Sequence, residues 1–243
     1  MQLDAQLNMR QALFVHGAGG GAWEWSIWQR VFRARGWRTR ALDLQPRTSE
    51  IGATKLNDYA EQVERSAQTL RAPVLVGASL GGLLALMSAP RIAPCALVLI
   101  NPLPPAGVSP RIATHDYPDV VCWGSRRSLA STKRAMPDAD AAACLYAHRR
   151  WRDESGAVLR EACAEVHVAR PQCPTLVFAS EHDADVPPQG SQALAALCGG
   201  EFHLLQSASH VGPLLGRQAP VIAESTLNWI ERCGAGFNEK YTF

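Results

Sequence analysis

The chain has 243 residues, a length that suits one α/β domain with a modest insertion and that allows a sizeable core. Apolar residues make up 47% and charged residues 19%, as in an ordinary globular protein, and the net charge is only +2. So small a charge gives no reason to expect nucleic acid or an anionic membrane as a partner, since both require concentrated basic surface.

No apolar run in the sequence reaches the roughly 18–20 residues that are needed to span a bilayer. The first residues of the chain lack the apolar stretch of a signal peptide. The seven cysteines are widely spaced and include no C-x-x-C pair, so we expect reduced thiols and no metal site, with a disulfide in a secreted form left open. These features predict a cytoplasmic protein.

The first part of the chain alternates between short apolar strands and helices. We predict strands over residues 11–15, 38–44, 74–76 and 95–100. We predict helices over residues 23–35, 56–70 and 83–88, because their apolar residues recur at helical spacing. In the first of these helices, for example, Trp25, Trp28 and Phe32 fall on or near one face.

The alternation breaks over residues 103–170, where only helix-like pieces at 128–136 and 138–151 are found, and then resumes. Strands are predicted at 174–179 and 201–205, helices at 189–198 and 216–233, and a loose tail from 234. Strands that alternate with helices imply an α/β fold, a mostly parallel central sheet with helices on both faces. We therefore expect a core domain of residues 1–102 and 171–243, and a helical cap of residues 103–170.

A G-x-S-x-G motif at Gly77, Ser79 and Gly81 lies between an apolar strand and an apolar helix. A nucleophile elbow requires strand, sharp turn and helix in this order, with small residues where side chains would collide with the adjoining elements. The turn exposes the hydroxyl and directs the amino end of the helix towards a developing anion. The pentapeptide alone is a weak signal, and an ordinary turn is the alternative, but its flanks favour Ser79 as a catalytic nucleophile.

A serine hydroxyl is a poor nucleophile unless a base accepts its proton, and folds with this elbow place a histidine late in the chain. His210 lies in a predicted loop between the last strand and the last helix, whereas His203 lies within the strand. An isolated loop histidine is usually only solvated, so position and order carry this interpretation. The acid that orients the imidazole should follow the strand 174–179, and we prefer Asp183 over Asp185, which could instead cap the next helix.

An oxyanion hole needs two backbone N–H donors, of which the residue after the nucleophile, Leu80, supplies one. The other is expected from the glycine-rich loop after the first strand, residues 17–21, where bare backbone can approach a substrate oxygen. Ala18 is the preferred donor in this loop, and Gly19 is the second choice.

The same loop has a competing interpretation as a phosphate-binding site. It lacks the lysine and Ser/Thr of a P-loop, but with Ala22 in the last position it fits a tolerated variant of G-x-G-x-x-G. Asp43 could then be the acid that a dinucleotide site needs. This oxidoreductase interpretation leaves Ser79 and His210 unexplained, so we predict no cofactor.

Considered together, these residues resemble the α/β-hydrolase superfamily over about residues 12–230. The H-G pair after the first strand, the elbow, the S-E-H-D-A-D-V-P segment and the late S-H pair occur in the family's order. The stretch H-G-A-G-G-G-A-W is also similar to the branch that contains plant methylesterases and hydroxynitrile lyases.

The resemblance implies a triad of Ser79, Asp183 and His210, with the amides of Ala18 and Leu80 as the oxyanion hole. Ser180 departs from the family pattern, which has glycine in the G-x-x-D before the acid, and Leu80 after the nucleophile is a second departure. These departures leave the triad intact but weaken the subfamily assignment.

The cap is expected to roof the site and to shape an acyl or alcohol pocket. Its aromatic residues either line that pocket or pack the cap onto the sheet: Tyr117, Trp123, Tyr146 and Trp151. The basic run Arg149, Arg150 and Arg152 could attract a carboxylate, although such runs are usually a solvated helix face.

We therefore predict an esterase-like serine hydrolase that cleaves a small carboxylic ester or a related acyl substrate, without a cofactor or a metal. Two alternatives keep the same residues: a lyase or carbon–carbon bond hydrolase with the same base, and a small-molecule receptor that retains the triad. The sequence leaves the oligomeric state open, including a homodimer.

Overall fold

The computed structural model describes residues 10–47, 49–110, 112 and 115–235. Six parallel strands form one sheet in the order β2-β1-β3-β4-β7-β8. Their bounds are β1 Gln11–Val15, β2 Arg38–Leu42, β3 Val74–Ala78, β4 Ala96–Ile100, β7 Thr175–Ser180 and β8 Glu201–Leu205. The mostly parallel central sheet that the sequence predicts is therefore confirmed.

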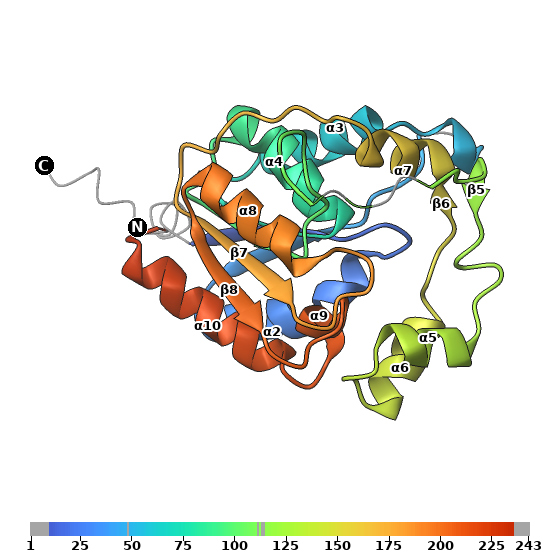
Figure 1. Ribbon diagram of the computed structural model, residues 1–243. Helices are drawn as coiled ribbons and strands as arrows, with labels where there is room; N and C mark the ends of the chain where they lie inside the picture. Colours follow the sequence, from blue (N-terminus) through green and yellow to red (C-terminus); the bar gives the residue numbers. More distant parts are fainter. Residues whose placement is uncertain (1–9, 48, 111, 113–114, 236–243) are drawn as a thin grey trace, which may run out of the picture.

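Helices cover both faces of the sheet (Figure 1). One face carries α3 Leu56–Ala67, α4 Leu80–Ile92 and α8 Pro188–Cys198. The other carries the 3-10 turn η1 Ala22–Trp25, α2 Ser26–Ala34, α9 Gly212–Leu215 and α10 Ala219–Arg232. A further 3-10 turn, η2 Ile51–Ala53, precedes α3.

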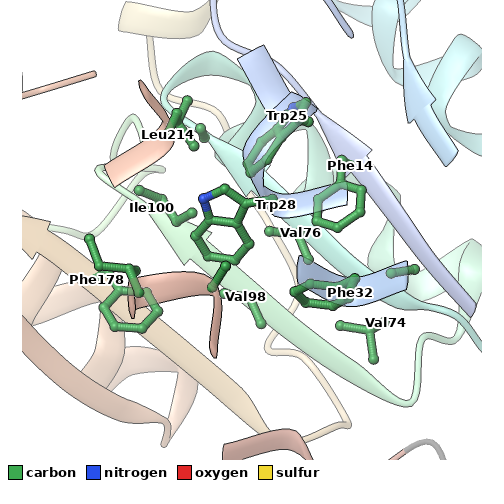
Figure 2. Close-up of a cluster of buried hydrophobic side chains, with 14 of the residues drawn as sticks. Phe14, Trp25, Trp28, Phe32, Val74, Val76, Val98, Ile100, Phe178 and Leu214 are labelled. Carbon is green, nitrogen blue, oxygen red and sulfur yellow. The ribbon is translucent and has the colours of Figure 1, made fainter. Parts of the chain in front are cut away.

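Two hydrophobic cores result from this layering, because successive side chains of a strand point to opposite faces. In β1, Phe14 packs towards α2 and α10, while Leu13 and Val15 pack towards α3 and α4. Figure 2 shows the first core, in which Phe14 lies among three aromatic rings at centroid distances of 5.1–6.4 Å, those of Trp25, Trp28 and Phe32.

The strand order also determines where a site can form. From β1 the chain first moves outwards to β2 and then returns to place β3 on the other side of β1. The loops that follow β1 and β3 therefore diverge, and in open α/β sheets such a switch point leaves a crevice at the carboxyl ends of the strands. The glycine-rich loop and the elbow follow these two strands.

The segment between β4 and β7 contains β5 Val120–Val121, α5 Leu129–Ala135, α6 Ala141–His148, β6 Glu154–Ser155 and α7 Gly156–Cys163. We call residues 103–170 the β4–β7 segment. Strands β5 and β6 pair antiparallel, and α5 and α6 lie beyond the arrowheads of β7 and β8 (Figure 1). Helix α7 packs against α3 and contributes Val158 to the core beneath it, so part of this segment belongs to the main body.

Several elements differ from the expected ones. The first predicted helix is a 3-10 turn followed by α2, and the helix after the elbow begins at Leu80 rather than at residue 83. Helix α7 and the pair β5–β6 were not predicted, and α9 was missed before α10. The predicted tail lies mostly outside the described residues, and so do residues 1–9, where no signal peptide is predicted. None of the described helices has the length and apolar character that crossing a membrane requires.

The first core predicts the response of the protein to truncation at Phe14. Phe14→Ala should lower the free energy of unfolding by about 3–5 kcal/mol, because the cavity left among rigid aromatic rings cannot collapse. Urea denaturation followed by circular dichroism measures this. Val221→Ala on the exposed side of α10, where the residue is 70% exposed, is the control and should change the value by less than about 0.5 kcal/mol. Equal effects of the two variants would contradict the proposed packing.

Candidate active site

Ser79 lies in a strained turn between β3 and α4. Its φ of 53° and ψ of −121° place it in a region that non-glycine residues rarely adopt. A Cβ at Gly77 would collide with the carbonyl oxygen of Gly81, and a Cβ at Gly81 would collide with that of Val15. Glycine at both positions lets β3, α4 and β1 approach each other, which explains why the predicted elbow requires glycine there.

The described contacts bring His210 together with Asp183. His210 Nδ1 lies 2.7 Å from Asp183 Oδ2, and the Asp183 side chain is fully buried. A carboxylate only accepts hydrogen bonds, so Nδ1 donates and Nε2 is the ring nitrogen left to act as a base. The other oxygen of Asp183, Oδ1, accepts from the backbone N–H groups of Asp185 and Val186, both at 2.8 Å. Asp185 does not replace Asp183 in this contact.

The surroundings of His210 adjust its basicity. Burial alone would lower the pKa of His210, but the hydrogen bond and the negative charge of Asp183 outweigh burial and raise it. The charge of Asp185 acts in the same direction. The imidazole therefore binds a proton more readily than an ordinary histidine.

Ser79 and His210 line one cavity of about 600 Å³. Most of its other lining residues come from the β4–β7 segment, among them the expected aromatics Tyr117, Trp123 and Trp151. The expected Tyr146 is not among the lining residues and packs edge-on against Trp23 instead. The lining mixes apolar and aromatic side chains with a few polar groups, a composition typical of small-molecule sites.

The two expected oxyanion donors come from different elements. Leu80 is the first residue of α4, and Ala18 lines the cavity in the loop after β1. This loop lies beside Ser79, because a Cβ at Gly17 would come within 3.1 Å of Ser79 Cβ. The N–H of Gly19, the second choice, donates to Glu154 Oε2 at 2.9 Å, so the contacts favour Ala18 over Gly19.

His16 holds the start of this loop as a neutral ring. Its Nε2 accepts from the Leu44 N–H at 3.0 Å, and its Nδ1 donates to the Gly17 carbonyl at 2.7 Å. Burial lowers the pKa of His16 to about 4. Asp43, the acid that a dinucleotide site would require, accepts from the Ala22 N–H at 3.1 Å, so its carboxylate serves the loop itself.

Two further contacts of the site could not be predicted from local patterns. Asn101, with a positive φ of 45°, donates through Nδ2 to the His210 carbonyl at 2.8 Å and to Ser180 Oγ at 2.9 Å. Asp138 of the β4–β7 segment accepts from Ser209 Oγ at 2.5 Å. The residue that departs from the family's glycine, Ser180, thus provides a partner for the asparagine that holds the His210 loop.

Glu24 is a buried acid that sequence analysis also missed, although it stands between two tryptophans in an apolar helical pattern. It is only 4% exposed, and its carboxyl lies against Gly20 beneath the glycine-rich loop. Burial raises the pKa of Glu24 to about 8, against the opposite effects of the Gly17 backbone and of His210. The carboxyl group is therefore largely protonated at neutral pH.

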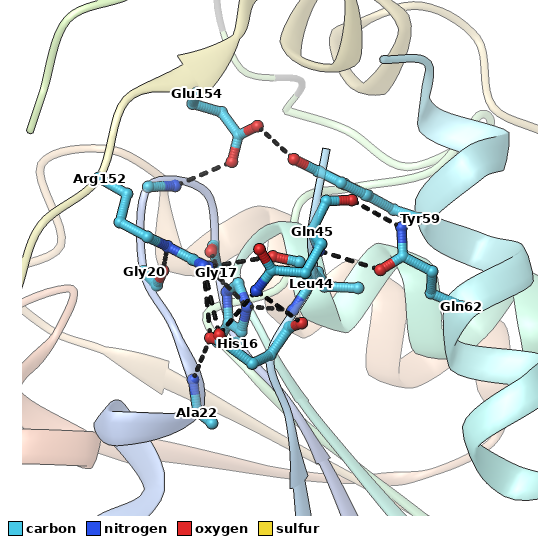
Figure 3. Close-up of polar contacts among 12 residues, drawn as sticks. His16, Gly17, Gly20, Ala22, Leu44, Gln45, Tyr59, Gln62, Arg152 and Glu154 are labelled. Carbon is cyan, nitrogen blue, oxygen red and sulfur yellow. Dashed lines mark hydrogen bonds and ion pairs between the residues drawn. The ribbon is translucent and has the colours of Figure 1, made fainter. Parts of the chain in front are cut away.

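Arg152 departs from the expected solvated helix face. Its Nε donates to the Gly20 carbonyl at 2.6 Å, and its Nη2 donates to the Leu44 carbonyl at 3.2 Å (Figure 3). The arginine therefore lies against the glycine-rich loop rather than in solvent alone. Arg150, by contrast, covers the ring of Tyr146 at 3.8 Å from its centroid.

Comparison with known proteins agrees with this fold. The sequence profile described as "Alpha/beta hydrolase family" matches residues 12–224. The "Probable esterase PIR7A" of Oryza sativa, in both the indica and japonica subspecies, is 36% identical over 118 residues. This match covers 43% of the chain, and the chain spans 44% of the length of the rice proteins.

Solved structures with similar folds include several plant-type enzymes. A methylesterase, MES16 from Arabidopsis, has a TM-score of 0.73 at 14% identity, covering 92% of this chain and 100% of that one. Polyneuridine aldehyde esterase has 0.71 at 17%, covering 91% and 99%. Tomato methylketone synthase I complexed with 2-tridecanone has 0.69 at 17%, covering 93% and 99%. At these identities the likeness establishes the fold, and the neighbours are those of the methylesterase-like branch that the sequence resembles.

The buried carboxyl of Glu24 predicts a pH-dependent stability. The folded protein holds this proton up to a pKa of about 8, whereas an unperturbed glutamate releases it at 4.5, so ionisation favours the unfolded chain and stability falls as the pH rises between these values. Glu24→Gln removes this pH dependence. The melting temperature of the variant minus that of the wild type should therefore rise from pH 5 to pH 8 and stay constant at higher pH.

Differential scanning calorimetry across this pH range measures the difference between variant and wild type. Glu61→Gln on α3, where the side chain is 53% exposed, is the matched control and should give a difference that does not vary with pH. A pH-independent difference for Glu24→Gln would contradict the buried neutral carboxyl.

Proposed function

The chain belongs to the alpha/beta hydrolase family, and on this premise we propose that it is a serine hydrolase that cleaves a small carboxylic ester or related acyl substrate. The observation that carries the proposal is the contact of His210 Nδ1 with Asp183 Oδ2 at 2.7 Å, beside a cavity that His210 lines together with Ser79. A base that is oriented by a buried acid and shares a cavity with a strained serine is the arrangement that nucleophilic acyl transfer requires.

In the first half of the proposed reaction, Ser79 Oγ attacks the carbonyl carbon of the substrate while His210 Nε2 accepts the hydroxyl proton. The carbonyl oxygen becomes an oxyanion, which accepts hydrogen bonds from the Ala18 and Leu80 amides. Asp183 keeps the imidazole in the required tautomer and stabilises its positive charge. His210 then returns the proton to the departing alcohol oxygen, which leaves an ester of Ser79.

In the second half, a water molecule replaces the alcohol. His210 accepts a proton from this water, and the resulting hydroxide attacks the acyl carbon of the Ser79 ester. The same two amides again hold the oxyanion. Collapse of the tetrahedral intermediate breaks the bond to Ser79 Oγ, which takes back its proton from His210, and the carboxylic acid is released.

The cavity and the relatives support the proposed class of substrate. A volume of about 600 Å³ suits a small molecule, and its mixture of apolar and aromatic lining residues favours a substrate with apolar parts. The rice relatives are described as probable esterases, and two of the structural neighbours as esterases. A small-molecule acyl substrate is therefore the proposed partner of this site.

A fluorophosphonate probe tests the nucleophile. The wild-type protein should be labelled at Ser79, and Ser79→Ala should abolish both labelling and turnover of p-nitrophenyl acetate, because the covalent step is lost. Mass spectrometry of the labelled peptide identifies the modified residue. An unlabelled protein that is instead stabilised by a nicotinamide cofactor would contradict the proposal, and labelling without multiple turnovers would favour a receptor.

Substitution of the two neighbouring aspartates tests the acid. Asp183→Asn should reduce kcat by ~10⁴-fold, because the imidazole loses the partner that selects its tautomer. Asp185→Asn should retain most of kcat but shift the acid limb of the kcat/KM profile to lower pH, since the charge of Asp185 raises the pKa of His210. A similar loss of kcat in both variants would argue against the assignment of Asp183.

A further inference from the structure

The β4–β7 segment returns to the sheet along the glycine-rich loop that follows β1 (Figure 3). The backbone N–H of Arg152 donates to the Gly19 carbonyl at 2.8 Å. Two residues later, Glu154 Oε2 accepts from the Gly19 N–H at 2.9 Å. Residues more than 130 positions apart in sequence are therefore joined through both polar groups of one loop residue.

Glu154 is itself held on several sides. It is only 4% exposed, and its second oxygen, Oε1, accepts from Tyr59 Oη at 2.9 Å and from the Ser155 N–H at 2.8 Å. Burial and the adjacent carboxylate of Glu154 raise the pKa of Tyr59, so the phenol keeps its proton and remains a donor. A buried carboxylate with donors on both oxygens is fixed in position, because each bond to a charged acceptor is stronger than a neutral one.

The fixed loop also determines the direction of the Ala18 N–H. The Gly17 carbonyl accepts from His16 Nδ1 at 2.7 Å and from the Gly20 N–H at 3.3 Å. Since a trans peptide is planar, the N–H of Ala18 points opposite to the Gly17 carbonyl, away from His16. The next N–H, that of Gly19, is already used by Glu154.

We propose that Glu154 is a positioning residue for the oxyanion hole: through the Gly19 N–H it fixes the loop so that the Ala18 amide is oriented before substrate binds. This inference rests on the proposed hydrolase function. It assigns the β4–β7 segment a role in stabilising the transition state, in addition to lining the cavity. Glu154 does not line the cavity and so acts through the loop alone.

The expected signature follows from this indirect role. A donor displaced by a fraction of an ångström loses most of its value for the oxyanion but little for a planar substrate, so kcat should fall while KM stays nearly constant. Glu154→Ala should lower kcat for p-nitrophenyl acetate by about 10- to 100-fold. Glu154→Gln, which keeps one oxygen to accept from the Gly19 N–H, should recover most of this loss.

A tetrahedral inhibitor provides a readout that a merely structural role would not change. A trifluoromethyl ketone forms an oxyanion adduct with a catalytic serine, whereas the product acid binds without one. Glu154→Ala should weaken the binding of the ketone by the same factor by which it lowers kcat, and should leave the affinity for the acid unchanged. Tyr59→Phe, which removes one partner of Glu154 and leaves the loop contact in place, should show the same pattern with a smaller factor.

The matched control is Glu161→Ala in the same segment. Glu161 Oε2 accepts from the Leu56 N–H of α3 at 2.8 Å, so it also joins the segment to the main body, but without a contact to the loop. It should leave kcat and the ketone affinity unchanged. All variants are assayed well below their melting temperatures, and hydrogen exchange of residues 16–21 should be faster in Glu154→Ala and unchanged in Glu161→Ala.

The outcomes separate this inference from the proposed function. Wild-type protein that labels at Ser79, together with a Glu154→Ala variant whose kcat or ketone affinity matches that of Glu161→Ala, would overturn the inference alone. A loss confined to KM, or equal weakening of ketone and acid, would do the same. Wild-type protein that neither labels nor turns over ester would overturn the proposed function and, with it, this role of Glu154.

Discussion

The site depends on the close approach of three backbone segments around Ser79. Strand β3, helix α4 and the end of β1 meet where Gly77 and Gly81 have no side chains, and any Cβ there would collide with a carbonyl oxygen. This contact holds the serine at a positive φ, which costs energy that the packed sheet on either side must supply. The loop that carries Ala18 begins beside this contact, since a Cβ at Gly81 would also collide with the His16 carbonyl.

Around Ser79, hydrogen bonds join residues that are far apart in the sequence. Asn101 at the end of β4 holds the His210 backbone, and Asp138 holds the neighbouring Ser209. Glu154 holds Gly19 on the opposite side of the serine. Two of these three anchors belong to the β4–β7 segment. The segment contacts the loops on both sides of Ser79, so it holds these loops in place in addition to lining the cavity.

The parts that the sequence predicted are those that a local pattern encodes. Apolar runs predicted all six strands of the sheet, and the elbow motif together with chain order selected Ser79, His210 and Asp183, of which the last two are in contact. Long-range contacts have no such local signal. Arg152 sits in a basic run that resembles a solvated face, and nothing near Glu154 indicates its partner 135 positions earlier. Helix α7 packs against α3, which is brought near only when the chain folds, so no local pattern indicated this helix.

The anchoring by Arg152 and Glu154 also bears on how chains of this family can be recombined. Relatives with the same sheet are natural donors for swaps of the β4–β7 segment, in which one specificity is exchanged for another. Here the exchanged piece would carry away the partners of both polar groups of Gly19. A chimaera would then inherit a new pocket together with a loosened loop, unless these two residues were retained at the junction with the recipient.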